Sequence, residues 1–211
     1  MSRRLITLVT LNLDMLNEGC FDALMDVQCF DLKAVESIRS NPRHSEISAT
    51  QYASPFAKSA VVDSLDVVIL GATQIDTDFN INVHTDSNGC IMGGSGGHSD
   101  TAAGAKLSMI IAPLSRARLP IVTDRVTCIS TPGSTIDVLV TQKGVAVNPK
   151  DVELKQRLLD AGVHVVDIHD LKALAERTSG VPDKPRLGEK IVADVIYRDG
   201  TVIDRIREVL A

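Results

Sequence analysis

Tryptophan is absent from the chain, and aromatic residues make up only 3% of its 211 residues. So few aromatic rings leave little surface for stacking nucleic-acid bases or sugar rings. Lysine and arginine form no cluster, and the formal net charge is -5 at pH 7. This acidic balance argues against binding to nucleic acid or to an anionic membrane surface.

Long apolar runs are also missing, and none approaches the roughly 20 residues that a membrane-spanning helix requires. The N-terminus carries two arginines but lacks a signal-peptide cleavage region, because Asn12, Asp14 and Asn17 interrupt its apolar residues. We therefore expect a cytoplasmic protein with no membrane segment.

Cysteine is sparse, and its spacing is not that of a metal site. Cys20, Cys29, Cys90 and Cys128 include no Cys-x-x-Cys pair and do not cluster with histidines in the sequence. This spacing favours reduced structural thiols over disulfides or a zinc site. We predict no bound metal.

Hydrophobic residues make up 44% of the sequence, which is enough for a substantial core, and the length favours one α/β domain. Residues 66–70 are continuously apolar, as in the central strands of parallel sheets. The spacing predicts an open, mostly parallel sheet flanked by helices. Strands are expected at 23–30, 66–70, 107–112, 119–126 and 163–168, hairpins within 136–147 and 190–206, and helices at 31–39, 152–161 and 170–178.

Three further stretches have a weaker pattern. Residues 5–16 fit either a helix or a strand. Residues 43–60 have little periodicity, which predicts an irregular segment with short helical pieces, and such long connections often form a lid or an interface. Residues 81–84 alternate like an exposed strand, and 86–89 have the composition of a turn.

Four of the five residues from 93 to 97 are glycine, between two apolar runs that predict strands. Without Cβ atoms, the peptide N–H groups of this segment can come close to a ligand oxygen. The residues that follow fit the start of a helix that Ser99 or Asp100 would cap, with its positive end facing the loop. The segment predicts a site for a negatively charged oxygen, with an ordinary tight turn as the alternative.

Several polar side chains accompany this loop. His98 would polarise a carbonyl or contact a carboxylate, although a histidine at a helix start often only caps or packs. Ser95 and Ser99 are natural carboxylate donors, with ordinary capping as the alternative. Asp26 and Gln28 share one face of the predicted strand 23–30, where they would line a cavity or bond to local backbone.

With these segments in place, the chain resembles the alpha-subunit family of bacterial citrate lyase from about residue 15 onward. The blocks that carry the resemblance are 24–32, 37–49, 76–83, 94–105, 123–126 and 146–149. More distantly, 70–75 followed by 94–100 is similar to the second half of the CoA-transferase fold. The resemblance implies one CoA-transferase-like α/β domain over 1–211, corresponding to the family's C-terminal half, with the N-terminal half absent.

The resemblance also implies a reaction, in which citrate displaces acetate from acetyl-acyl-carrier protein to give the citryl thioester. The thiol belongs to a CoA-like prosthetic arm on the carrier protein, or to acetyl-CoA as substrate, and no covalently bound cofactor is expected. Partners implied are the beta subunit, the gamma (acyl-carrier) subunit and citrate, and an isolated half is expected to form a homo-oligomer or to have poor activity.

The chemistry of these segments, together with the resemblance, gives the expected site residues. Catalytic roles are expected for His98, Asp26 and Gln28. Substrate or CoA binding is expected for Gly93, Gly94, Ser95, Gly96, Gly97, Ser99 and Asp100. Many CoA transferases carry the acyl group on a glutamate in a Glu-Asn-Gly motif, but here Ser87 precedes the only Asn-Gly. This departure fits direct attack by the substrate carboxylate in a ternary complex.

Two other functions stay open on the sequence alone. The chain would be a non-catalytic partner half that only completes a complex, or a sugar-phosphate isomerase or ligand-sensing domain of the same fold. The second of these requires a phosphate site with a positioned acid and base, and the acidic chain offers no obvious basic pocket.

Overall fold

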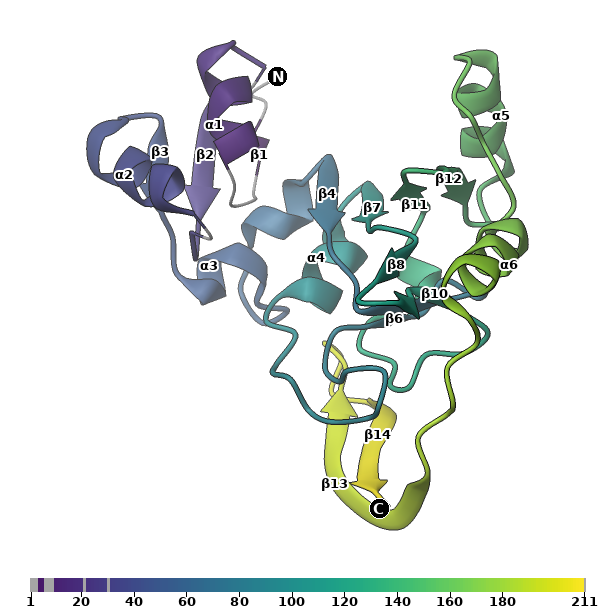
Figure 1. Ribbon diagram of the computed structural model, residues 1–211. Coiled ribbons are helices and arrows are strands. Elements are labelled where there is room, and N and C mark those ends of the chain that lie inside the picture. The colour runs from purple at the N-terminus through teal and green to yellow at the C-terminus, as the bar shows by residue number, and fades with distance from the viewer. Residues whose placement is uncertain (1–3, 6–9, 21, 30, 211) are drawn as a thin grey trace.

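The computed structural model describes residues 4–5, 10–20, 22–29 and 31–210. The first elements along the chain are β1 (Arg4–Leu5), α1 (Thr10–Asn17), β2 (Ala23–Asp26), α2 (Leu32–Ser40) and β3 (His44–Glu46). They form an N-terminal lobe around a parallel sheet in the order β1-β2-β3 (Figure 1). Asp31 caps α2 by accepting a hydrogen bond from the N–H of Ala34 at 2.8 Å.

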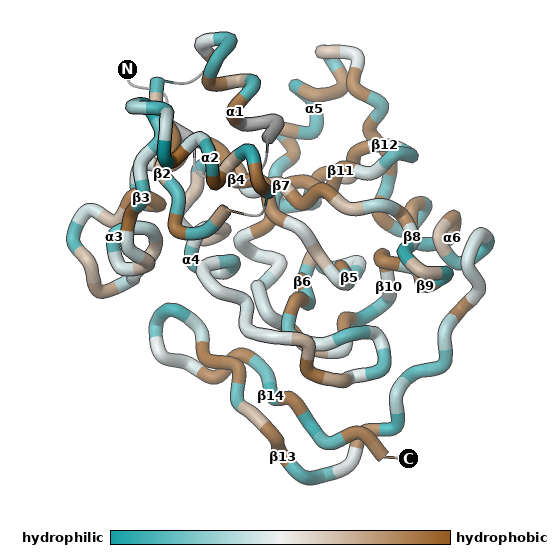
Figure 2. Tube along the Cα trace, turned by 60° about the vertical axis from the view of Figure 1, so that its left-hand side comes forward, coloured by the Kyte–Doolittle hydropathy of each residue, from teal (hydrophilic) through white to brown (hydrophobic). Residues whose placement is uncertain are grey.

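The central sheet has four strands in the order β12-β11-β7-β4. Their bounds are β4 (Val67–Leu70), β7 (Leu107–Ile111), β11 (Val138–Thr141) and β12 (Gly144–Val147). The strands β4, β7 and β11 pair in parallel, and β11 and β12 form the antiparallel hairpin that the sequence predicts. Figure 2 shows hydrophobic residues concentrated along β4 and β7, which explains why these strands occupy the middle of the molecule.

Smaller sheets pack below the central one. Their strands are β5 (Gln74–Asp76), β6 (Ile81–Asn82) and β10 (Val122–Thr123), in the order β10-β5-β6, and the pair β8 (Ser115–Arg116) and β9 (Leu119–Pro120). Ile75, Phe79 and Ile81 from this region are fully buried with Ile110 and Leu139 of the central sheet. One main core therefore joins both sheets.

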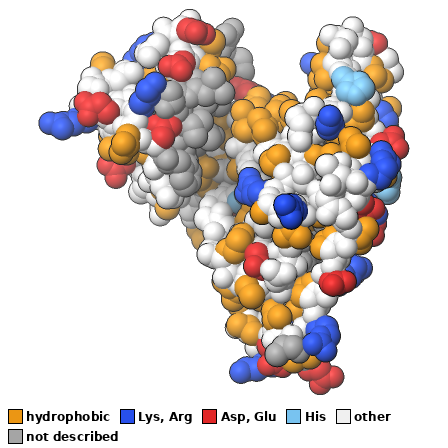
Figure 3. Space-filling model, viewed as in Figure 1, with side chains coloured by type: hydrophobic (Ala, Val, Ile, Leu, Met, Phe, Trp, Pro, Cys, Tyr) orange, Lys and Arg blue, Asp and Glu red, His pale blue; other side chains and the backbone are white. Residues whose placement is uncertain are grey.

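The remaining helices cover or leave this core. They are α3 (Ala49–Ala53), η1 (Val61–Ser64), α4 (His98–Gly104), η2 (Gly133–Thr135), α5 (Val152–Asp160) and α6 (Ile168–Ser179). α6 buries Ile168, Leu171 and Ala175 against the core. α5 buries no residue and projects at the upper right of the space-filling view, separated by a notch from the N-terminal lobe (Figure 3).

A long hairpin, β13 (Leu187–Ile196) and β14 (Val202–Val209), lies at the other end of the molecule. Its Val195 and Ile206 pack on buried Cys128. The Asp204 carboxylate also accepts a hydrogen bond from the N–H of Ile129 at 2.7 Å. These contacts anchor the hairpin to residues 128–129.

The α/β class and the parallel pairing of β4, β7 and β11 are confirmed, and so is the position of most elements. All four cysteines are free of disulfides in the structure. Among the described residues, no helix has the length and apolar character needed to cross a bilayer. The prediction of one open sheet is refined, because the strands divide among several sheets.

Four local expectations are wrong. Residues 163–168 form only an isolated bridge between Val165 and Val145, since no neighbouring strand continues the pairing. Residues 81–82 are buried rather than exposed, and 119–126 divides into β9 and β10, which pair with different strands. Residues 43–60 do contain an expected short helical piece, α3, and the short strand β3 in addition. Gly97, not Ser99 or Asp100, is the N-cap of α4, and it makes no side-chain cap.

The N-cap of α6, Asp167, is expected to contribute to the stability of the chain. The Asp167 carboxylate accepts a hydrogen bond from the N–H of His169 at 2.8 Å. Asp167→Ala is expected to lower the free energy of unfolding by about 1 kcal/mol, because α6 packs on the core and loses its cap. Asp170→Ala, in the same first turn, is the control and should lose about 0.5 kcal/mol from the helix dipole. Equal losses in urea denaturation would contradict the capping role.

Candidate functional site

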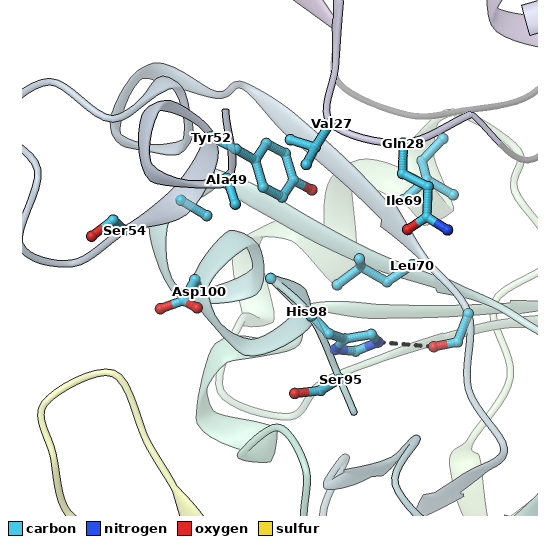
Figure 4. A pocket seen from close by; sticks show the side chains of 14 residues that line it. Val27, Gln28, Ala49, Tyr52, Ser54, Ile69, Leu70, Ser95, His98 and Asp100 are labelled. Carbon is cyan, nitrogen blue, oxygen red and sulfur yellow. Dashed lines mark hydrogen bonds between the residues drawn. The ribbon is translucent and has the colours of Figure 1, made fainter. Parts of the chain in front are cut away.

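A cavity of about 530 Å³ lies where the N-terminal lobe meets the central sheet (Figure 4). Its walls come from the end of β2, from α3, from the carboxyl end of β4 and from the glycine loop that leads into α4. The lining residues are Val27, Gln28, Ala49, Tyr52, Ala53, Ser54, Ile69, Leu70, Gly71, Ser95, Gly96, Gly97, His98 and Asp100. Ligands of parallel α/β sheets bind at this end of the strands.

The glycine loop, residues 93–97, borders the cavity with its backbone open. Its first two glycines and Gly96 are exposed, and a Cβ built on any of the three would meet no atom within 4 Å. In the described part of the chain, no hydrogen bond engages the N–H groups of residues 93–97. Gly96 has φ of 55°, which a residue with a side chain adopts only under strain. The open amides that the sequence predicts are therefore present.

His98 fixes the end of this loop to the sheet. Its Nε2 lies 2.9 Å from the carbonyl oxygen of Gly71, and its Nδ1 lies 2.8 Å from Oγ1 of Thr131. A carbonyl can only accept, so Nε2 carries the proton and Nδ1 accepts from the threonine hydroxyl. Burial is the main cause that lowers the pKa of His98, which keeps the ring neutral. Both ring nitrogens are occupied inside the protein.

Tyr52 forms the wall opposite the loop. A Cβ on Gly97 would lie 2.7 Å from Cε1 of Tyr52, so only glycine lets the ring pack this closely. Burial raises the pKa of the Tyr52 hydroxyl, which therefore stays protonated at neutral pH. Figure 4 shows that this hydroxyl points toward Val27 and Gln28.

Asp100 is the one ionisable acid or base besides His98 and Tyr52 among the lining residues. Its Oδ1 lies 3.7 Å from Nε of Arg198, in the turn of the β13–β14 hairpin, and has no hydrogen-bond partner in the described structure. Burial raises the pKa of Asp100, and the charge of Arg198 opposes this shift. The hairpin thus supplies a cation beside the cavity.

The structure separates two residues that the sequence places together. Gln28 lines the cavity, whereas Asp26 is 1% exposed and lies behind it. The Asp26 Oδ2 lies 2.8 Å from Nε2 of His44, and the His44 Nδ1 lies 3.0 Å from Oγ of Ser37. Cys29 donates from its thiol to the same Asp26 oxygen at 3.6 Å.

Six of the ten predicted site residues therefore line the cavity: Gln28, Ser95, Gly96, Gly97, His98 and Asp100. Gly93 and Gly94 lie at the outer, exposed end of the loop, Ser99 is buried beneath it, and Asp26 is buried behind the wall. Tyr52 was not predicted as a site residue. The one sequence signal for Tyr52 is its position in the irregular segment 43–60, a kind of long connection that often forms a lid or an interface.

The family model described as Citrate lyase, alpha subunit (CitF) matches residues 5–209. The chain belongs to this family. It is 49% identical to the citrate lyase alpha chain of Escherichia coli over 196 residues, which is 93% of this chain and 38% of that protein. The same identity and coverage of this chain hold for the Klebsiella pneumoniae alpha chain, of which 39% is covered. The chain thus spans about two fifths of the length of the curated relatives it matches.

A solved structure agrees with this assignment. The alpha subunit of citrate lyase from Streptococcus mutans, in complex with citrate, superposes with a TM-score of 0.89 at 43% identity. The superposition covers 99% of this chain and 41% of that one. RipA from Yersinia pestis, at 17% identity and a TM-score of 0.53, shares the fold over 83% of this chain and 42% of its own. The α/β fold expected from the sequence is confirmed, and it is the fold of this family.

Proposed function

We propose that this citrate lyase alpha chain contributes to exchange of acetate for citrate on the thiol of acyl-carrier protein or CoA. A citrate carboxylate attacks the acetyl thioester carbonyl, the tetrahedral oxyanion collapses, and the thiolate leaves behind a mixed anhydride. The thiolate then attacks the citryl carbonyl and releases acetate, so that the products are the citryl thioester and acetate.

The observation that carries the proposal is the open backbone of the glycine loop at the cavity. Each addition step places negative charge on a former carbonyl oxygen. Backbone N–H groups without internal partners stabilise such an oxyanion, and removal of one such donor typically costs about 100- to 1000-fold in turnover. The Streptococcus mutans relative, in complex with citrate, supports citrate as the carboxylate substrate.

Direct attack by substrate fits the side chains around the cavity. No glutamate stands among the lining residues, and the one lining carboxyl, Asp100, faces the Arg198 side chain. The positive charge of Arg198 beside Asp100 offsets the charge of this carboxylate, which lessens repulsion of an anionic substrate. We propose Gln28, Ser95 and Tyr52 as hydrogen-bonding groups for the substrate.

We assign His98 a positioning rather than a proton-transfer role. Its two hydrogen bonds, to Gly71 and Thr131, leave no ring nitrogen free to meet a substrate. The histidine instead holds the C-terminal end of the glycine loop against β4. Asp26 likewise acts through the position of the β2 end that carries Gln28.

Partners follow from the family. We propose that the chain acts with the beta and gamma (acyl-carrier) subunits of citrate lyase, in the cytoplasm, and that it corresponds to the C-terminal half of its relatives. The thiol is supplied by the CoA-like arm of the carrier protein or by acetyl-CoA. The surface of this half would meet either a second copy or the other half of the alpha chain.

The alternatives find less support. A sugar-phosphate isomerase requires a cation for the phosphate, but the lining residues include no lysine or arginine, and Arg198 beside the cavity already faces Asp100. A purely structural partner half would not require an open glycine loop. The test is acetate release from acetyl-CoA upon addition of citrate, with the chain alone and with a polypeptide that covers the rest of a relative's alpha chain. Acetate release in either mixture supports the proposal, and binding of carrier protein without acetate release in both contradicts it.

A further inference from the structure

A second cluster of reactive side chains lies behind the cavity wall, outside the proposed site. Asp26 ends β2, His44 begins the adjacent strand β3, and Cys29 follows three residues after the aspartate. One ligand atom from each of the three lies within 4.8 Å of the other two. Sequence spacing does not reveal this cluster, because α2 separates the cysteine from the histidine along the chain.

The cluster has a buried oxygen that no group of the described residues satisfies. Asp26 is 1% exposed, and its Oδ1 has no hydrogen-bond partner in the described structure. Its Oδ2 contacts His44 and Cys29, but the only ion-pair partner of this carboxylate among the described residues is the histidine. A buried carboxylate without a full set of partners is costly, and a bound cation would remove that cost.

We propose that Asp26, Cys29 and His44 bind a zinc ion, with the fourth position open to water or another ligand. Thiolate, imidazole and carboxylate together are a zinc donor set, whereas magnesium and calcium prefer oxygen alone. Ligand atoms of a tetrahedral zinc lie about 3.3–3.8 Å apart, given bonds of about 2.0–2.3 Å. The Cys29–Asp26 distance of 3.6 Å already fits, and the His44–Asp26 distance of 2.8 Å must open slightly.

Ser37 completes the site from behind. Its Oγ lies 3.0 Å from Nδ1 of His44, on the side of the ring opposite the proposed metal. Such a contact to the second nitrogen fixes the orientation of a metal-binding histidine and commonly changes affinity about 10- to 100-fold. Residues 27 and 28 line the cavity and lie in the sequence between two proposed ligands, Asp26 and Cys29. A zinc ion bound to both ligands would therefore hold this wall of the cavity in place.

The test is a titration of the chelator-treated chain with Co²⁺ and Zn²⁺. We expect one metal per chain, a thiolate-to-cobalt charge-transfer band, and release of protons, since Cys29 must lose its proton on binding. Cys29→Ser should abolish the band, because it removes the thiolate. Ser37→Ala should weaken zinc binding about 10- to 100-fold. Cys90→Ser, at an exposed free cysteine, is the matched control and should bind as the unaltered chain does.

A measurement on the unaltered chain makes the test independent of folding in the variants. Zinc should slow alkylation of Cys29 while Cys90 reacts at its usual rate, as followed by mass spectrometry of the labelled peptides. Equal alkylation of Cys29 with and without zinc would overturn the proposal. So would a charge-transfer band that persists in Cys29→Ser or disappears in Cys90→Ser.

Discussion

Gly96→Ala is expected to lower turnover of acetyl-CoA and citrate about 100-fold or more while the chain stays folded. Gly96 has φ of 55° in the loop that borders the cavity, and a Cβ at this position would meet no other atom. The substitution therefore acts through the backbone, which must leave the left-handed region and turn its N–H groups away from the oxyanion. Loss of one such donor typically costs about 100- to 1000-fold.

Gly162→Ala is the matched control for this experiment. Gly162 follows α5 with φ of 76°, and a Cβ there also meets nothing within 4 Å. The two substitutions carry similar backbone strain, of about 1 kcal/mol, but only Gly96 borders the cavity. Steady-state kinetics and urea denaturation of both variants separate the two effects. Similar turnover in the two variants would show that the loop amides do not act on the oxyanion.

The loop could be predicted from the sequence because its function is a property of local backbone. Four glycines in five residues leave the backbone without side chains wherever the chain places it, and α4 follows the loop directly. The start of α4 could not be predicted in the same way. Gly97 serves as its N-cap because Tyr52 packs against that position, and Asp100 turns toward Arg198 instead of capping.

The rest of the site depends on contacts between distant residues. Tyr52 faces the loop from α3, in a segment whose periodicity is too weak to predict which side chain points inward. The cluster of Asp26, Cys29 and His44 forms because β2 and β3 pair in parallel across α2, a register that spacing alone does not reveal. Residues 163–168 fail as a strand for a related reason, since a strand requires a neighbour that continues its hydrogen bonds.

His98→Leu is expected to lower the free energy of unfolding by about 2–4 kcal/mol and to reduce turnover strongly. The leucine would leave the carbonyl of Gly71 and the hydroxyl of Thr131 without their present partner in a buried site. It would also release the glycine loop from β4. Urea denaturation and steady-state kinetics measure the two losses.

His98→Gln distinguishes a positioning role from proton transfer. The glutamine amide can still donate to Gly71 but cannot act as an acid or base near neutral pH. If His98 only positions the loop, this variant regains most of the turnover lost in His98→Leu, and its pH profile for kcat/KM matches that of the unaltered chain. A folded glutamine variant with the turnover of the leucine variant would show that the imidazole takes part in proton transfer.

The free energy of unfolding should depend on pH because the buried His98 ring is neutral in the folded chain. Burial lowers the pKa of His98 in the folded chain, whereas in the unfolded chain it titrates near the ordinary value of about 6.5. Below that pH the unfolded state binds a proton that the folded state does not, so stability falls as the pH is lowered through about 6.5. Above it the ring is neutral in both states and contributes no pH dependence. His98→Gln should therefore lose less stability between pH 7 and about pH 5.5 than the unaltered chain does, and equal losses in urea denaturation would contradict the buried neutral ring.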